Sequence, residues 1–182
     1  MLFEYETERL LLKIVRPEQA QEVLDFYFKD RELFEKYEPD RVLNFYTPAI
    51  QKQILTYEYN GAIKGTMFRY YVYRKQAPKQ MIGTISFHNI QKGIYSNCEI
   101  GYKFSSEFQH MGYATEALKE IVDLIFCDLQ LHKILAYAMP ENTASICLLE
   151  RAGFEKEGVC RDHLFLHNKW EDHVLYSVIN PY

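Results

Sequence analysis

The sequence predicts an α/β protein, in which a mixed, mostly antiparallel sheet of about seven strands carries about four helices on its faces. Short runs of alternating apolar and polar residues recur along the chain, as is typical of strands. Between them lie segments whose apolar residues return every three or four positions, as in amphipathic helices. No repeat, low-complexity segment or linker interrupts the 182 residues. We therefore expect one domain spanning residues 1–182.

The first half of the chain predicts one strand, a helical region and a three-stranded meander. Pro17 suits the first turn of a helix, and Pro39 breaks the charged, aromatic stretch that follows it. The predicted order is a strand over Leu10–Val15, a helix after Pro17, helix and loop over Arg31–Phe45, a helix over Ala49–Tyr59, and strands over Met67–Arg74, Met81–His88 and Asn97–Phe104.

The second half predicts two further helices, a strand between them and a final hairpin. Gly153 suits the left-handed residue that often ends a helix. The predicted order is a helix over Gly112–Leu129, a strand over Lys133–Met139, a helix from Pro140 to Ala152, and strands over Val159–Leu166 and Trp170–Ile179 joined through His167-Asn168-Lys169.

Composition excludes several classes of function. A net charge of −4 without a long run of Lys or Arg argues against nucleic-acid binding. No apolar run is long enough to span a bilayer, and the acidic N-terminus does not resemble a signal peptide, so we expect a cytoplasmic protein without a membrane partner. Four widely spaced cysteines favour reduced, mostly buried thiols over disulfides or a metal site.

The segment Glu107–Ala117 carries the most informative motif, Gln109-x-x-Gly112-x-Ala114 followed by Thr115. It joins a predicted strand to an amphipathic helix, whose first amides have no partner within the helix. These amides and the positive end of the helix dipole favour a pyrophosphate, although an ordinary strand-to-helix turn would also use a glycine here. Neither the Gly-x-Gly-x-x-Gly nor the Gly-Lys-Ser/Thr pattern is present, which points to a different phosphorylated carrier.

Together with Asn142-x-x-Ser145 and Arg151-Ala-Gly-Phe154, this motif resembles the GNAT N-acetyltransferase superfamily, and most closely its RimJ/RimL branch of ribosomal-protein N-terminal acetyltransferases. Further segments that resemble the branch run from one end of the chain to the other. They are Thr7-Glu-Arg-Leu-Leu-Leu, residues 31–39, Phe45-Tyr-Thr, Ile82-Gly83, Glu99-Ile-Gly-Tyr102 and residues 170–177.

The resemblance implies acetyl-coenzyme A (acetyl-CoA) as the carrier and acyl transfer to a primary amine. In such folds the fourth and fifth strands, here Asn97–Phe104 and Lys133–Met139, splay apart around the pantetheine arm. The residues expected to hold the phosphates are Gln109, His110, Met111, Gly112, Tyr113 and Ala114, with the Thr115 hydroxyl nearby. Asn142 matches a residue that contacts the pantetheine arm, and its alternative role is a plain helix cap.

Acyl transfer to an amine needs a base, an oxyanion donor and a proton for the thiolate. Glu99 is the first candidate base, because alternation places it opposite the apolar face of Cys98 and Tyr102. His88, at the end of a neighbouring strand, is the second. Ser145 matches the serine of the RimJ/RimL branch and is the candidate acid, since Leu149 replaces the usual tyrosine.

The acceptor stays open between three alternatives. The first is a protein N-terminus, such as that of a ribosomal protein, because an α-amino group has a pKa of about 7.7–8.0 and needs only a weak base. The second is a small amine such as a polyamine, an amino acid or an antibiotic. The third is a non-catalytic acyl-CoA-binding module, which Leu149 would favour. A homodimer is possible, and Cys147 is expected to lie in the core rather than act as a nucleophile.

Overall fold

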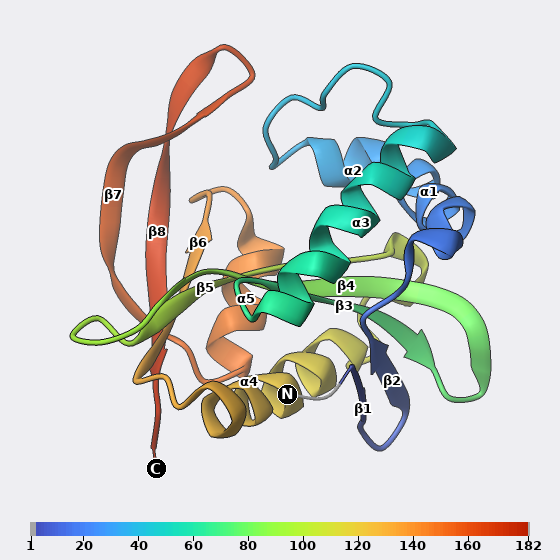
Figure 1. Ribbon diagram of the computed structural model, residues 1–182. Coiled ribbons are helices and arrows are strands. Elements are labelled where there is room, and N and C mark those ends of the chain that lie inside the picture. The colour runs from blue at the N-terminus through green and yellow to red at the C-terminus, as the bar shows by residue number, and fades with distance from the viewer. Residues whose placement is uncertain (1–2, 182) are drawn as a thin grey trace.

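The computed structural model describes residues 3–181, so Met1 and Leu2 of the acidic N-terminal segment lie outside the described residues, as does Tyr182. A single eight-stranded sheet, in the order β1-β2-β3-β4-β5-β6-β8-β7, runs through this part of the chain (Figure 1). The strands are β1 (Glu4–Glu6), β2 (Leu10–Lys13), β3 (Phe68–Arg74), β4 (Ala77–Gln91), β5 (Asn97–Phe104), β6 (Lys133–Ala138), β7 (Glu155–Leu166) and β8 (Lys169–Ile179).

Five α-helices accompany the sheet, together with 3-10 turns at Pro17–Gln19 and Ser106–Phe108. The helices are α1 (Ala20–Lys29), α2 (Arg31–Glu35), α3 (Pro48–Lys64), α4 (Tyr113–Leu129) and α5 (Thr143–Arg151). The predicted mixed, mostly antiparallel sheet with helices on its faces is confirmed, with β5 and β6 as a parallel pair.

Two expected counts need correction. The sheet has eight strands rather than seven because the short β1 pairs with β2, and three residues were too few to show a pattern. The α-helices number five rather than four because α2 forms a separate turn. Helix α3 also continues past Tyr59, through Gly61, whose lack of a side chain admits Met67: an added Cβ would lie 2.4 Å from the Met67 Cγ.

The two faces of the sheet are covered by different helices, as Figure 1 shows. Buried residues of α4 and α5 pack with one face of the strands, including Phe87, Cys98 and Ile100. Residues of α1, α2 and α3 pack against the opposite face near Tyr71 and Tyr73. We call these the α4 face and the α3 face. Alternation along β5 therefore places Tyr102 on the α4 face and Glu99 on the α3 face.

A gap opens between β5 and β6. The two strands pair in parallel only where Asn97–Glu99 meets Lys133–Leu135. Beyond that point β5 remains paired with β4 as far as Phe104, while β6 remains paired with β8 as far as Ala138. Each strand is thus held along its outer side, and the twist of the sheet carries the two apart. The splay implied by the family resemblance is present at the predicted strands.

The hairpin formed by β7 and β8 extends beyond the sheet on the α3 side (Figure 1). Its turn is His167-Asn168, with φ of 49° and 65°. Two successive left-handed residues are typical of a tight hairpin turn, which is why Lys169 already belongs to β8. Among residues 3–181, no helix combines the length and the apolarity needed to cross a bilayer.

Candidate active site

The segment Gln109–Thr115 forms the exposed connection between β5 and helix α4. Gly112 caps the helix with φ of 79°, and His110 also takes a left-handed conformation with φ of 61°. Gly112 accepts a hydrogen bond from the Glu116 amide at 3.0 Å, which starts the helical ladder. The predicted position of the helix start is therefore confirmed, with Gly112 just outside the first helical residue, Tyr113.

The backbone amides of this loop suit an anion. From His110 to Thr115, six consecutive N–H groups donate no hydrogen bond to another described residue. Unpaired amides at a helix N-terminus, following residues in left-handed conformations, form a concave donor surface for phosphate oxygens. Only a glycine at position 112 leaves this surface free of a Cβ at φ 79°. The chemistry of the donors thus fits a diphosphate-bearing cofactor.

Helix α5 brings Asn142 and Ser145 together beside the gap. The Asn142 side chain accepts a hydrogen bond from the Ser145 amide at 3.1 Å, so its capping role is confirmed. The Ser145 hydroxyl lies 2.8 Å from the Tyr102 hydroxyl, which also donates to the Ser145 carbonyl at 3.2 Å. Burial raises the pKa of Tyr102 above its ordinary value, although the Ser145 contact opposes this. Tyr102 therefore keeps its proton and joins β5 to α5.

The two candidate bases, Glu99 and His88, lie directly opposite each other on β5 and β4. The His88 Nε2 is 3.6 Å from a Glu99 carboxylate oxygen, which is too long for a direct hydrogen bond. Burial lowers the pKa of His88, and the charge of Arg69 acts in the same direction against that of Glu99. His88 is therefore mostly neutral at pH 7. Glu99 stands where β5 and β6 begin to part.

Sequence reasoning missed three further residues on this face. The Tyr137 ring of β6 stacks on His163 of β7 with centroids 4.3 Å apart, and His163 lies 5.3 Å from the buried His173. Burial raises the pKa of Tyr137, and the Glu99 charge adds to this increase. Burial and the charge of His173 lower the pKa of His163, against the smaller effect of Glu99. Alternation from Leu135 would have placed Tyr137 on this face. The β7 irregularity that places His163 has no sequence signal that we recognise.

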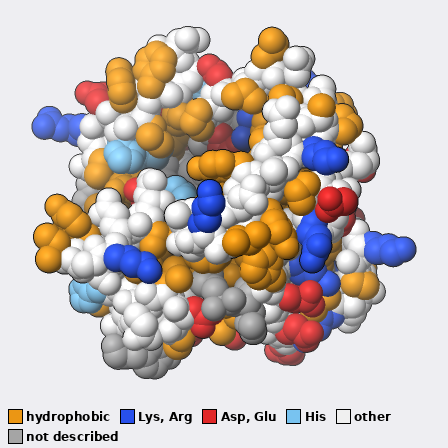
Figure 2. Space-filling view, viewed as in Figure 1, with side chains coloured by type: hydrophobic (Ala, Val, Ile, Leu, Met, Phe, Trp, Pro, Cys, Tyr) orange, Lys and Arg blue, Asp and Glu red, His pale blue; other side chains and the backbone are white. Residues whose placement is uncertain are grey.

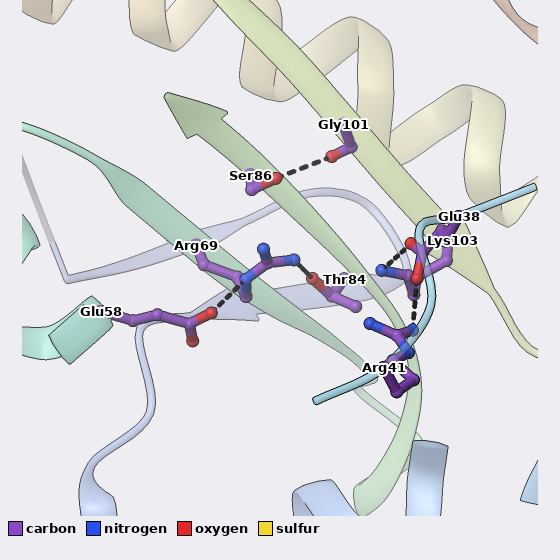
Figure 3. A network of polar contacts seen from close by, with 8 residues as sticks. All are labelled: Glu38, Arg41, Glu58, Arg69, Thr84, Ser86, Gly101 and Lys103. Carbon is purple, nitrogen blue, oxygen red and sulfur yellow. Dashed lines mark hydrogen bonds and ion pairs between the residues drawn. The ribbon is translucent and has the colours of Figure 1, made fainter. Parts of the chain in front are cut away.

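A network of polar residues lies on the α3 face of the sheet, next to Glu99 and His88 (Figure 3). Arg69 contacts Glu58 of α3 at 2.6 Å and Thr84 at 3.1 Å. Ser86 donates to the Gly101 carbonyl at 3.3 Å. Lys103 of β5 forms an ion pair with Glu38, which fastens the loop between α2 and α3 to the sheet.

The same loop meets the tip of the β7–β8 hairpin. The ring nitrogens of His167 lie 3.0 Å from an Asp40 carboxylate oxygen and 3.1 Å from the Glu35 carbonyl oxygen. These contacts bridge residues 127 and 132 positions apart in sequence. In the space-filling view the surface is hollowed between the hairpin and the helical side, and histidine side chains border the hollow (Figure 2). Two other depressions, near Arg16 and near Pro78, lie away from the gap.

The four cysteines are free thiols, as expected, but the expectation that they are mostly buried was wrong. Cys98 is buried, whereas Cys127 and Cys147 are exposed and Cys160 is half-buried. Cys147 faces outward because α5 directs its neighbour Leu149 into the core instead. Leu149 is fully buried, so the residue that replaces the usual tyrosine acts in packing.

Comparisons with known proteins agree with this geometry. A family model described as an acetyltransferase (GNAT) domain matches residues 9–155. The [ribosomal protein uS5]-alanine N-acetyltransferase of Escherichia coli (strain K12) is 30% identical over 175 residues, covering 96% of this chain and 90% of that protein. Ribosomal-protein-S5-alanine acetyltransferase from Vibrio fischeri superposes with a TM-score of 0.91 at 30% identity, covering 98% of this chain and 97% of that one. Mycobacterium smegmatis RimJ in complex with CoA-disulfide gives 0.88 at 25% identity, over 97% and 86%.

Proposed function

We propose that this chain, which belongs to the GNAT acetyltransferase family, acetylates the N-terminal α-amino group of a protein. It is an N-acetyltransferase that uses acetyl-CoA. The choice of acceptor rests on the position of Glu99. This side chain is half-exposed where β5 and β6 part, and it lies opposite a neutral His88. We further propose that residues 1–182 act as one catalytic domain.

The donor is held by backbone and by few side chains in this proposal. The amides from His110 to Thr115 bind its diphosphate, with Gln109 opening the loop and the Thr115 hydroxyl as a further donor. The Asn142 carboxamide oxygen is used in capping, which leaves its NH2 group to contact the pantetheine arm. Acetyl-CoA supplies a thioester, an acyl donor that reacts with a neutral amine.

Glu99 is the proposed base. Above the lowered pKa of His88, the neutral imidazole forms no ion pair with Glu99, and the Glu99 carboxylate is the group that takes the proton of the amine in this proposal. Since roughly one α-amino group in ten is already neutral at pH 7, a weak base of this kind is sufficient.

Ser145 is the proposed proton donor for the sulfur that leaves. Its hydroxyl lies on the α4 face of the gap, whereas Glu99 lies on the α3 face. Tyr102 stays protonated and hydrogen-bonds to Ser145, so it holds the Ser145 hydroxyl in position. Proton removal and proton donation are thus assigned to opposite faces of one sheet, which keeps the two groups from neutralising each other.

The hollow on the α3 face supports a protein acceptor. It is bounded by the α2–α3 loop and by the hairpin, so an extended N-terminus can enter between them. The similarity to enzymes described as acting on ribosomal protein S5 supports the same class.

Thiol release from acetyl-CoA tests the proposal against three acceptors: a peptide with a free N-terminus, an N-terminally blocked peptide with an internal lysine, and a polyamine. We expect turnover with the first, with kcat/KM rising until about pH 8 and then levelling, since the α-amino pKa is about 7.7–8.0. Turnover of the lysine or polyamine alone would assign a different acceptor. Binding of CoA with no turnover of any of them would indicate a binding module.

A further inference from the structure

The side chain of Arg9 lies against the phosphate loop and was given no role by the sequence. Its Nη2 would be 3.4 Å from a Cβ added to Gly112. Its guanidinium stacks 4.5 Å above the centre of the Tyr113 ring, the first residue of α4. Arg9 belongs to the Thr7-Glu-Arg-Leu segment before β2, more than a hundred residues away from the loop in sequence.

The other edges of the guanidinium are already occupied. The Nε donates to Glu116 at 2.6 Å, and Nη1 donates to the Met111 carbonyl at 3.2 Å. Glu116 also accepts hydrogen bonds from the Arg9 amide at 2.8 Å and from Thr7. An arginine has five N–H donors in a rigid fork, and the contacts to described residues leave both protons of Nη2 unused. Because Nε and Nη1 are held by these hydrogen bonds, Nη2 is directed at the phosphate loop near Gly112.

Glu116 is well suited to hold Arg9 in this position. Burial opposes its ionisation, but the hydrogen bonds from Thr7 and Arg9 outweigh this and lower its pKa. It therefore stays charged at neutral pH. Because Glu116 neutralises the net charge of Arg9, the contribution of Arg9 at the loop is a short-range, directed hydrogen bond rather than a long-range attraction.

We propose that the Nη2 of Arg9 binds the diphosphate of CoA from the side, next to the unpaired amides of residues 110–115. The inference rests on the proposed placement of the cofactor on this loop. It adds a side-chain contact, from a segment remote in sequence, to a site otherwise made of backbone.

The test is the dissociation constant for CoA, measured by calorimetry on the intact chain and on four variants. Arg9→Gln removes the contact, and we expect roughly tenfold to hundredfold weaker binding, as for a hydrogen bond to a charged group. Arg9→Lys keeps a charge and should recover part of the loss. Glu116→Gln keeps one oxygen for the Thr7 hydroxyl and the Arg9 amide but replaces the acceptor of Nε by an NH2 group, so it loosens the guanidinium and should weaken binding less than Arg9→Gln does. Lys119→Ala removes an exposed cation from the same helix, as a matched control.

Three ligands identify the group that Arg9 contacts. CoA and dephospho-CoA both contain the diphosphate and should lose the same factor in Arg9→Gln, whereas pantetheine, which lacks phosphate, should lose none. A loss seen only with CoA would assign Arg9 to the 3′-phosphate and overturn the proposal. An equal loss with pantetheine would also overturn it, because it would mean that Arg9 only supports the conformation of the loop.

Thermal unfolding without ligand checks that each variant is folded. If Arg9→Gln is not folded, the affinities of Arg9→Lys for CoA and for pantetheine decide, since only the affinity for CoA should fall. Unchanged CoA binding in Arg9→Gln would refute this inference alone. Failure of the unsubstituted chain to bind CoA would instead refute the proposed function.

Discussion

The phosphate loop and the acceptor side of the molecule are built in different ways. The loop occupies residues 109–115 and presents backbone amides, so its geometry follows from a few local φ angles and one glycine. The acceptor side is assembled from α2, α3, β4, β5 and the hairpin, and it is held by side-chain contacts such as His167 with Asp40. A backbone site is recognisable as a short motif, whereas an assembled surface is not, because its residues are brought together only by folding.

The largest expected effect is on the acceptor side, at the base. Glu99→Gln should lower kcat/KM for an N-terminal peptide by about 10²–10⁴ at neutral pH, the usual contribution of general-base catalysis. Steady-state thiol release measures this, with the exposed Glu120→Gln as control. Unchanged turnover from about pH 6 to about pH 9 would remove Glu99 from the mechanism.

The next effect tests the backbone character of the loop. Gly112→Ala adds a Cβ at φ of 79° and should weaken CoA binding about tenfold, since a left-handed alanine costs roughly 1–2 kcal/mol. Gly93→Ala is the matched control, because Gly93 has φ of 76° with no atom near an added Cβ. If both variants lose stability equally and neither loses CoA affinity, the loop does not bind the diphosphate.

A smaller effect is expected at the proton donor on the α4 face. Tyr102→Phe removes one hydrogen bond to Ser145 and should lower kcat by about 2- to 10-fold, the range for a neutral hydrogen bond. Ser145→Ala should lower kcat further, because it removes the proposed donor itself. Tyr57→Phe, on the exposed surface of α3, serves as the control. Equal rates for Ser145→Ala and the unsubstituted chain would leave Ser145 with only its structural role.

The smallest effect concerns the hairpin tip. His167→Ala removes two surface contacts, which are worth at most about 1 kcal/mol, so KM for a protein acceptor should change by a factor of about five or less. KM for acetyl-CoA should not change, because the loop is independent of the hairpin. A double-mutant cycle with Asp40→Asn measures the coupling. A change in acetyl-CoA KM of the same size would show that the two regions are not separate.

The features that could be predicted from the amino-acid sequence are those that depend on local patterns. Alternation fixed β5 with Glu99 and Tyr102 on opposite faces, and the motif around Gly112 located the start of α4. The strand β1 was not predicted, because its three residues are too few to show a periodicity. The outward position of Cys147 was not predicted either, because the half-polar helix α5 has no unique inner face in the sequence.

Contacts between residues far apart in the sequence could not be predicted and are seen only in the folded chain. Arg9 reaches the loop, Tyr102 reaches Ser145, and His163 reaches Tyr137 through contacts between segments far apart in the chain. The gap between β5 and β6 is likewise a property of the sheet, since it arises from pairing on the outer side of each strand and from twist. Hydrogen-bonding geometry within a few residues is encoded locally, whereas side-chain contacts across a sheet depend on the register and packing of the whole domain.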